Sequence, residues 1–575
     1  MIGIRRLSTA LAVRATRLSA WTAVRAAIAG AAMLLCGIWI AIDRTPPSWD
    51  PAHYLDMTEQ YLHGWQAGGP GGLRHALDTA DPSRGPLFPL AMLPFFAVVG
   101  VSHQAGLLVN LALLPVLLLA VAAIGARLAD RRAGLIAMLV AATEPLLVGL
   151  SHKALVDFLS VTLTVLAVLL MLASDCFLRT RAAAALGAVV ALGWLTKVTF
   201  LALIIAPLAL TLGRAAVTAV TELPDAAHRR RGLRRLANAA LTLGLGIGIA
   251  ALWYVPHLAA TLDYVRSATG GALAIGAGPD HNFDLGAAVE FSLRFLNNEV
   301  TWVVALVLVG AGLLVVPTWV RAALRRPWPA WRDDVWRAAF LVSWAAVPWV
   351  SVAMGRDHDP RNAVASVPAI AVLLGCLVSA VRWRGARGVL TATVGSAGIA
   401  LTLLTMLPPI RGLPDRWAVS TPAGFAVIPV DAAVVGYEVR PQGRDDATPV
   451  IEYLEAMASR RPRAGPLGVG VAQEHPSINP NTLGWVADSR GDSMIVSDPP
   501  AGPDVIAQLD AELAPIDVML YIAPPRSSGK TRTDLLNQST TSVVLGDRLF
   551  SIFSGSRRAF LLDDGQTLWV LGRSA

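Results

Sequence analysis

Long apolar runs recur throughout residues 26–407, and short arginine-rich segments separate many of them. A run of about 20 apolar residues can cross the hydrocarbon core of a bilayer as a helix. The chain is 54% hydrophobic and only 15% charged, and its mean hydropathy is +0.55. Soluble domains do not have this composition. The sequence therefore predicts an all-α polytopic membrane domain over residues 26–407.

Hydropathy predicts about eleven transmembrane helices. These predicted spans are residues 26–42, 104–126, 133–150, 158–173, 182–195, 199–212, 236–255, 300–320, 338–354, 362–381 and 389–407. A further apolar segment, 91–100, is short and contains Pro94, so we expect a helix in the membrane interface there. An odd number of spans places the two ends of the chain on opposite sides of the membrane.

Arginine is concentrated in alternate loops, which agrees with these spans. The basic segments are 127–132, 179–181, 214–235, 321–337 and 382–387, together with the N-terminal segment 1–25. Cytoplasmic loops are enriched in Lys and Arg, so we place these segments in the cytoplasm. The net charge of +8 then reflects membrane topology, and we expect no nucleic-acid partner. We expect a multi-pass protein of the bacterial cytoplasmic membrane that keeps its first span, with the arginines before it determining topology.

The opposite, extracytoplasmic face receives the loop 43–103 and the segment 408–575. This last segment alternates helical and strand patterns, which predicts a small extracytoplasmic α/β domain. We expect a helix at 450–458 capped by Thr448-Pro449, and strands at 466–471, 494–496, 517–522, 542–553 and 567–571. No phosphate loop or nucleophile elbow occurs in it. Its expected role is support or acceptor recognition.

The loop 43–103 carries an aspartate directly after the first span. Asp50 followed by Pro51 is typical of a helix N-cap and first helical position, which predicts a surface helix at 51–63. Two interpretations stay open at this point. Asp50 only caps the helix while Trp49, Tyr54, Tyr61 and Trp65 form an interfacial aromatic belt, or Asp50 is also a catalytic carboxylate.

Several motifs follow one another in a fixed order on the extracytoplasmic side. They are Asp50 and Tyr54 in a D-x-x-x-Y pattern, Arg84 before Pro86-Leu-Phe-Pro-Leu90, Gly193-Trp-Leu-Thr-Lys197, Trp253-Tyr-Val-Pro256, and Pro360-Arg-Asn362. In this order they resemble the GT-C glycosyltransferases, and most closely the bacterial branch related to protein O-mannosyltransferases and lipid A aminoarabinose transferases. The resemblance covers residues 26–381.

The resemblance implies an enzyme that transfers a sugar from a polyprenyl phosphate to a lipid, polysaccharide or protein acceptor at the outer face of the membrane. Asp50 is then the candidate base, and Asp157 a second catalytic candidate that orients the acceptor or a cation. Arg84, Lys197 and Arg361 are candidate ligands of the donor phosphate, because cations stabilise the charge that grows on a phosphate leaving group. His53 joins this group because some similar enzymes have an arginine there.

Each of these residues also has a structural interpretation. Arg84 or Lys197 can hold a turn near the headgroups, although an intramembrane lysine is a functional hypothesis by default. Arg361 can pair with its acidic neighbours, and Asp157 can cap the span after it. Tyr54, Tyr61 and Glu144 are candidate substrate-binding residues.

No cofactor is expected to be obligatory. Asp280-His281 and Asp357-His358-Asp359 have the side chains of a divalent-cation site, but such runs are more often solvated turns. The three cysteines, at 36, 176 and 376, have no metal-ligand spacing. We therefore predict no zinc site and no obligatory metal, and the dependence on a divalent ion stays open.

The chain departs from the family pattern at three places. Pro51 and Ser83 stand where many relatives have acidic residues, and Asn362 stands where an aromatic is usual. The alternative function is a transporter or flippase for a lipid-linked or anionic solute. Such proteins often contain inverted repeats and place their charges near the midplane, and this sequence shows no internal duplication.

Overall fold

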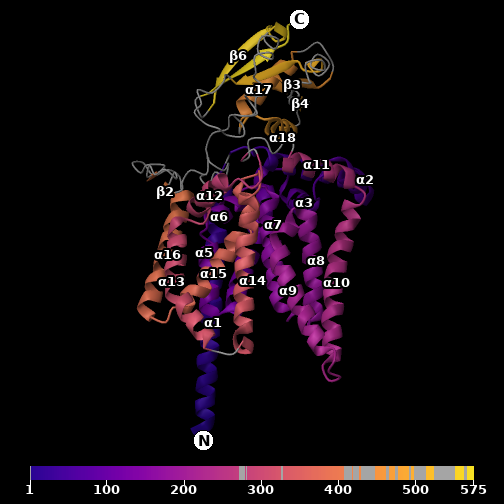
Figure 1. Cartoon of the computed structure of the whole chain (residues 1–575). Helices are drawn as coiled ribbons and strands as arrows, with labels where there is room; N and C mark the ends of the chain where they lie inside the picture. The colour runs from indigo at the N-terminus through magenta and orange to yellow at the C-terminus, as the bar shows by residue number, and fades with distance from the viewer. Residues whose placement is uncertain are drawn as a thin grey trace.

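The structure is a computed structural model of the whole chain (Figure 1). It describes residues 2–43, 45–270, 279, 281–325 and 328–406 of the membrane part. In the C-terminal part it describes residues 417–418, 426–428, 447–460, 465–472, 475, 477–490, 494–497, 513–522, 551–562 and 566–574.

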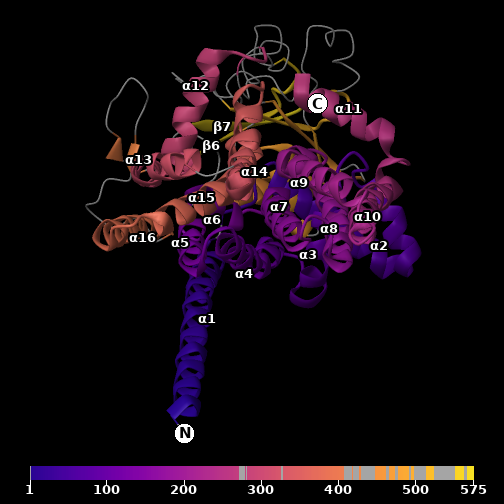
Figure 2. The same cartoon turned by 60° about the horizontal axis from the view of Figure 1, so that its bottom comes forward.

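Long helices run side by side through the membrane part (Figures 1 and 2). They are α1 (Ile2–Ile42), α4 (His103–Leu128), α5 (Arg131–Ala141), α6 (Pro145–Ser151), α7 (Val156–Ala173), α8 (Thr180–Thr196), α9 (Phe200–Glu222), α10 (Arg229–Tyr254), α13 (Trp302–Leu324), α14 (Trp328–Ala353), α15 (Ser366–Ala380) and α16 (Arg384–Met406). In Figure 2, α13 and α16 lie on one side of the bundle and α8–α10 on the other. The chain is a multi-pass integral membrane protein.

Every predicted span corresponds to a helix of this bundle. Among the described residues, eight helices are long and apolar enough to cross a membrane, or nine if the bent pair α5 and α6 counts as one span. The shorter helices α8 and α15 account for the other two predicted spans.

One predicted span, 133–150, is not continuous. It breaks into α5 and α6, whose axes differ by 62°. The break falls just before Pro145, the first residue of α6, which has no N–H for a bond to the preceding turn. Residues 362–381 are likewise divided, because the short 3₁₀ helix η3 (Pro360–Ala363) precedes α15.

Further helices lie at the end of the bundle that carries the C-terminal part (Figure 1). These are α2 (Asp50–Thr79), α3 (Leu87–Val99), α11 (Leu258–Gly270), α12 (Leu285–Arg294) and the π-helical turn η2 (Phe295–Glu299). The helix predicted at 51–63 is the first half of α2, which kinks at Gly68 and Gly69, where Gly69 has φ 56°. The short apolar segment at 91–100 belongs to α3, a 13-residue apolar helix, and its place in the membrane interface stays a prediction.

The C-terminal part contains a mixed five-stranded sheet in the order β4-β3-β5-β7-β6. Its strands are β3 (Leu467–Val471), β4 (Met494–Ser497), β5 (Val518–Ile522), β6 (Ser556–Leu561) and β7 (Thr567–Gly572), and a separate pair joins β1 (Trp417–Ala418) and β2 (Ala426–Ile428). β3 pairs in parallel with β4 and β5, whereas β7 pairs antiparallel with β5 and β6.

Four of the five predicted C-terminal strands match β3, β4, β5 and β7. Of the fifth, 542–553, residues 542–550 lie outside the described residues. The predicted helix is α17 (Ala447–Ala458), which begins one residue before the proposed cap Thr448. The sequence did not predict β6 or α18 (Pro480–Arg490).

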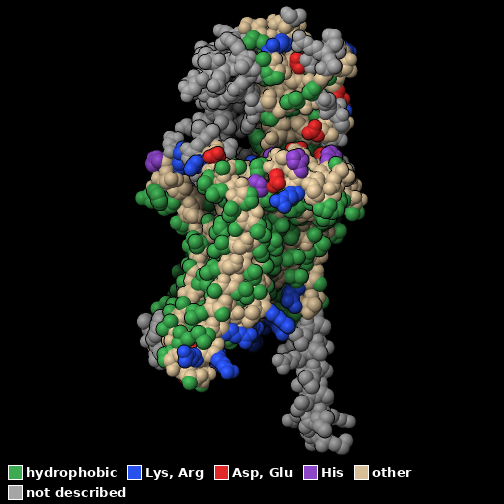
Figure 3. All heavy atoms as spheres, turned by 90° about the vertical axis from the view of Figure 1, so that its right-hand side faces the viewer, with side chains coloured by type: hydrophobic (Ala, Val, Ile, Leu, Met, Phe, Trp, Pro, Cys, Tyr) green, Lys and Arg blue, Asp and Glu red, His purple; other side chains and the backbone are tan. Residues whose placement is uncertain are grey.

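The sheet-bearing part contacts the membrane part through α18, which packs against α2. Figure 3 shows a band of Lys and Arg side chains at the opposite end of the bundle, while Asp, Glu and His gather near the C-terminal part. This separation agrees with the alternation of basic loops in the sequence. The polar side chains not explained by topology therefore share one end of the molecule.

Candidate active site

Asp50 lies between two arginines that are distant in the sequence. Its Oδ1 accepts a hydrogen bond from Arg84 Nη1 at 3.1 Å, and its Oδ2 accepts one from Arg361 Nη1 at 3.0 Å. The Asp50 side chain is 30% exposed, so this ion-pair centre opens to solvent on one side. Three of the predicted site residues thus meet in one group.

The loop between α2 and α3 places Arg84 against this carboxylate. Arg84 also donates from Nη1 to the Tyr54 hydroxyl at 3.2 Å and forms an ion pair from Nε to Asp81 at 3.3 Å. Its guanidinium lies over the ring of Tyr264 in α11. The neighbouring Gly85 packs so closely on the end of α8 that a Cβ there would lie 2.0 Å from the Leu195 carbonyl oxygen. A glycine is therefore required where this loop meets the turn that carries Lys197.

Lys197 follows α8 and joins α7 to η3. Its Nζ donates to Asp157 Oδ1 and to Asn362 Oδ1, both at 2.8 Å. Asn362 in turn donates to Asp357, and its neighbour Arg361 pairs with Asp359 at 2.8 Å as well as with Asp50. The short helix η3 thereby connects the Asp50 centre to the Lys197 centre.

The two capping interpretations are wrong. Trp49 is the N-cap of α2, with no side-chain cap bond, and Asp50 directs its carboxylate to the arginines instead. Trp49 has φ 45°, a conformation that non-glycine residues rarely adopt and that is often found at functional sites. Asp157 lies within the first turn of α7, whose N-cap is Leu155, and its buried carboxylate pairs with Lys197.

The electrostatics keep Asp50 ionised. Burial alone would raise the pKa of Asp50, but the guanidinium groups of Arg361 and Arg84 outweigh burial and hold it well below its usual range. Burial also opposes the charge on Arg84, yet Tyr54 and Asp50 raise the Arg84 pKa. The site is thus a compact group of charges, in which each cation already pairs with a carboxylate of the protein: Arg84 and Arg361 with Asp50, and Lys197 with Asp157.

The remaining predicted site residues lie at different distances from this centre. His53 Nε2 contacts Asp81 at 2.9 Å, so it joins the site through that carboxylate. Tyr54 contacts Arg84 directly, whereas Tyr61 is fully buried, and its hydroxyl has no hydrogen-bond partner among the described residues. Glu144 lies outside the Asp50 group, buried beside Glu299 of η2.

Glu299 gives a prediction about pH. Burial, with Asp359 nearby, raises the pKa of Glu299 to about 8. Its unfolded value is about 4.3, so between about pH 4.3 and 8 the folded state binds more protons, and Glu299 lowers stability as pH rises, by up to about 1.4 kcal/mol per pH unit. We expect Glu299→Gln to remove this part of the pH dependence. Unfolding temperatures of both proteins from pH 5 to 9 should converge at low pH and diverge at high pH, and parallel curves would contradict the assignment.

Sequence reasoning missed Asp81 and Tyr264, and gave no role in the site to Asn362. Asp81 precedes Arg84 by one helical turn, a spacing that favours contact, but the segment between them contains Pro82 and offered no helical pattern. Among the residues that the structure describes, no group of three or more His, Cys, Asp or Glu side chains is arranged to hold a metal ion.

Comparison with known proteins agrees with this architecture. Residues 83–224, which include Arg84, Asp157 and Lys197, match the family model described as dolichyl-phosphate-mannose-protein mannosyltransferase. ArnT from Cupriavidus metallidurans bound to undecaprenyl phosphate has the same fold, with a TM-score of 0.54 and 14% identity over 96% of this chain and 98% of that chain. The chain therefore has the fold of these glycosyltransferases and contains a segment that matches one of their families. The predicted fold class and the resemblance seen in the motifs are confirmed.

A second solved structure shares the fold over nearly the whole chain. It is the archaeal oligosaccharyltransferase AglB from Archaeoglobus fulgidus in complex with an inhibitory peptide and a dolichol-phosphate. Its TM-score is 0.51, with 12% identity over 96% of this chain and 74% of that chain. No curated protein matches the chain in sequence. The likeness to solved structures therefore concerns the fold.

Proposed function

We propose that this protein is a glycosyltransferase that moves a sugar from a polyprenyl-phosphate donor to a hydroxyl of a lipid, polysaccharide or protein acceptor at the extracytoplasmic face. The observation that carries the proposal is the contact of Asp50 with Arg84 and Arg361, beside Lys197 bound to the same short helix η3. One carboxylate facing several cations is what displacement of a phosphate leaving group needs. The ArnT structure supports the donor class, because it is bound to undecaprenyl phosphate.

The proposed reaction is a direct displacement at the anomeric carbon. The acceptor oxygen forms the new bond to that carbon, and the bond from the carbon to the phosphate oxygen breaks. The acceptor proton passes to Asp50, and the polyprenyl phosphate leaves with the bonding electron pair. Arg84, Lys197 and Arg361 stabilise the charge that develops on the phosphate oxygens.

The low pKa of Asp50 gives the donor a second role. A carboxylate held by two guanidinium groups is a weak base. When a phosphate takes over hydrogen bonds of Arg84 and Arg361, that stabilisation of the carboxylate falls, and its pKa rises toward the ordinary value. Asp50 thus becomes a stronger base only when a donor is bound.

The other site residues support this arrangement in the proposal. Asp157 fixes Lys197 from a position that is only 2% exposed, and Asp359 fixes Arg361 from the opposite side to Asp50. His53 and Asp81 hold the Arg84 loop, while Tyr54 lines it. Tyr61 and Glu144 lie farther from the reacting groups and keep only an indirect role.

The position of the charges favours transfer over transport. Arg84 lies in the loop between α2 and α3, and α2 lies at the end of the bundle that carries the C-terminal part (Figure 1). Arg361 shares Asp50 with Arg84, and Lys197 contacts Asn362 beside Arg361, whereas transporters place their coupling charges near the midplane. We place this end outside the cytoplasm because the basic band lies at the opposite end (Figure 3).

A transfer assay tests the function: purified protein is incubated with a panel of polyprenyl-phosphate sugars and with membrane extract as the source of acceptor. We expect at least one donor to be consumed, with release of free polyprenyl phosphate and labelled sugar on an extracted acceptor. If the wild-type protein consumed no donor of a broad panel, the transferase proposal would fail. Movement of intact donor across a proteoliposome membrane would instead favour the flippase.

Arg84 gives a prediction about donor use. Its guanidinium contacts Asp50, Tyr54 and Asp81 together, a planar arrangement that an ammonium group does not reproduce. We expect Arg84→Lys to raise the KM for the donor by about tenfold or more, because one hydrogen bond to a charged group contributes about 1.5–3 kcal/mol. Steady-state kinetics over a donor titration measure this, with Arg74→Lys on the exposed side of α2 as the control. An unchanged donor KM would remove Arg84 from the phosphate site.

A further inference from the structure

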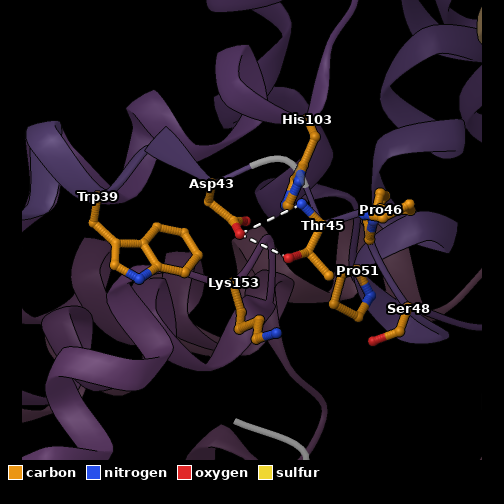
Figure 4. A pocket seen from close by; sticks show the side chains of 9 residues that line it. Trp39, Asp43, Thr45, Pro46, Ser48, Pro51, His103 and Lys153 are labelled. Atoms are coloured by element: carbon orange, nitrogen blue, oxygen red, sulfur yellow. Dashed lines mark hydrogen bonds between the residues drawn. The ribbon is translucent and has the colours of Figure 1, made fainter. Parts of the chain in front are cut away.

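A polar pocket lies at the start of α2, between α1 and α4 (Figure 4). It is a small, partly open pocket, lined by Trp39, Asp43, Thr45, Pro46, Pro47, Ser48, Pro51, His103 and Lys153. None of Arg84, Lys197 and Arg361 lines it. It adjoins the active site through Pro51, which follows Asp50 in the chain.

Lys153 is the cation of this pocket. Among the residues that the structure describes, its ammonium group has no ion-pair or hydrogen-bond partner, although an intramembrane or interfacial lysine is costly without one. In Figure 4 the side chain extends toward Pro51 and Ser48 and away from Asp43. The Asp43 carboxylate accepts a hydrogen bond from Thr45 Oγ1 at 2.7 Å. An anion entering the pocket would therefore meet a lysine ammonium group that has no ion-pair partner among the described residues, with the Asp43 carboxylate on the other side of the pocket.

The backbone of Lys153 is held in place, so its side chain starts from a fixed position beside the pocket. Asn110, fully buried in α4, donates from Nδ2 to the Lys153 carbonyl at 2.6 Å and to the Leu150 carbonyl at 3.3 Å. The preceding residue, His152, stacks on Trp39 with ring centroids 4.1 Å apart. A lysine that only reached for the headgroups would not need this fixed base.

His103 supplies a second polar group to the pocket. Its side chain lines the pocket and is 7% exposed as a residue, and its ring contacts the Thr45 backbone. One of the two nitrogens of an imidazole always carries a proton, and the ring has two positions for hydrogen bonds, so the Thr45 contact leaves one ring nitrogen for a further partner. Ser48 adds a hydroxyl at the rim (Figure 4). A lysine ammonium group, an imidazole and a hydroxyl thus face the same small pocket.

We propose that this Lys153 pocket binds a phosphate group. A tetrahedral oxyanion accepts hydrogen bonds from an ammonium, an imidazole and a hydroxyl at once, which satisfies all three groups. Its source is either a phosphate on the acceptor, positioned next to the proposed base, or the headgroup of a neighbouring lipid. Only the link to the acceptor depends on the proposed function, because binding itself needs no sugar transfer.

The test measures binding rather than activity. Purified full-length protein in neutral detergent is first saturated with a polyprenyl phosphate to fill the donor site, and inorganic phosphate is then titrated against chloride at matched ionic strength. A ligand that binds only the folded state raises the unfolding temperature with concentration. We expect phosphate to raise the unfolding temperature of the wild-type protein and of Lys153→Arg. For Lys153→Gln we expect phosphate to bind about tenfold more weakly, or more weakly still.

Two further variants keep the result interpretable. His103→Gln should also weaken the phosphate effect, whereas Arg74→Gln, on the exposed side of α2 and outside both sites, should retain it. The same titration in nanodiscs of phosphatidylglycerol or phosphatidylcholine identifies the source. An effect suppressed only by phosphatidylglycerol assigns the site to lipid headgroups, and an equal effect in both assigns it to a soluble or acceptor-borne phosphate. No phosphate effect beyond chloride in wild type, or an undiminished effect in Lys153→Gln, would overturn the proposal.

Discussion

Asp50→Asn is expected to abolish sugar transfer while the protein stays folded. The amide keeps the shape of the carboxylate but cannot accept the acceptor proton, and a positioned base contributes about a hundred- to ten-thousand-fold to rate. The substitution does not remove a helix cap, because Asp50 makes no cap bond in α2. Turnover of a labelled donor, with the unfolding temperature measured on the same preparation, checks both parts of the expectation.

Asp359→Asn is the matched control for that variant. Asp359 also pairs with Arg361, at 2.8 Å, whereas Arg84 pairs with Asp50 and Asp81. Its loss weakens the positioning of one arginine and leaves the proposed base in place, so we expect a much smaller fall in turnover than for Asp50→Asn. Equal losses in the two variants would mean that Asp50 acts only as a partner of Arg361.

Lys197→Met is expected to have the largest effect on stability. It leaves the Asp157 carboxylate, on a residue only 2% exposed, without its ammonium partner. Removing one partner of a buried ion pair costs about 3–5 kcal/mol. The variant should unfold at a clearly lower temperature in detergent and should transfer no sugar.

A double variant separates the two roles of Lys197. Lys197→Met with Asp157→Asn removes both charges, so the buried carboxylate no longer lacks a counterion and much of the lost stability should return. If Lys197 also stabilises the donor phosphate, the double variant should still transfer no sugar although its stability is restored. Recovery of transfer in the double variant would show that Lys197 is purely structural, and recovery of neither property would show that Asp157 has a role beyond the pair.

The membrane part was largely predictable because it depends on local properties. Apolar length and arginine placement act segment by segment, so the runs at 104–126 and 236–255 correspond to α4 and α10. The bend between α5 and α6 was missed because apolar length alone suggested one span. Pro145 was a signal for a break at this position, since proline cannot donate a backbone hydrogen bond to the preceding turn. The C-terminal sheet was predicted in part, since β6 is exposed and basic and has no strand-like alternation of apolar residues.

The site was predictable in its members but not in its contacts. The order of the motifs brought Asp50, Arg84 and Arg361 together, yet Asp50 and Arg361 lie 311 residues apart, and no local pattern shows which atoms meet. The capping prediction failed for the same reason, since tertiary contact with two arginines outweighed a local bond to the backbone. Asp81 was missed because its role depends on its contacts with Arg84 and His53, and only the fold determines those contacts.

In the proposed mechanism, Asp50 and the donor phosphate share the guanidinium groups of Arg84 and Arg361. The most direct measurement is the affinity of wild-type protein and Asp50→Asn for polyprenyl phosphate, determined alongside transfer. Because the neutral amide competes less well for Arg84 and Arg361, we predict that the variant binds polyprenyl phosphate at least as tightly as wild type while transfer is lost. Clearly weaker binding by the variant, or transfer at the wild-type rate, would contradict the account.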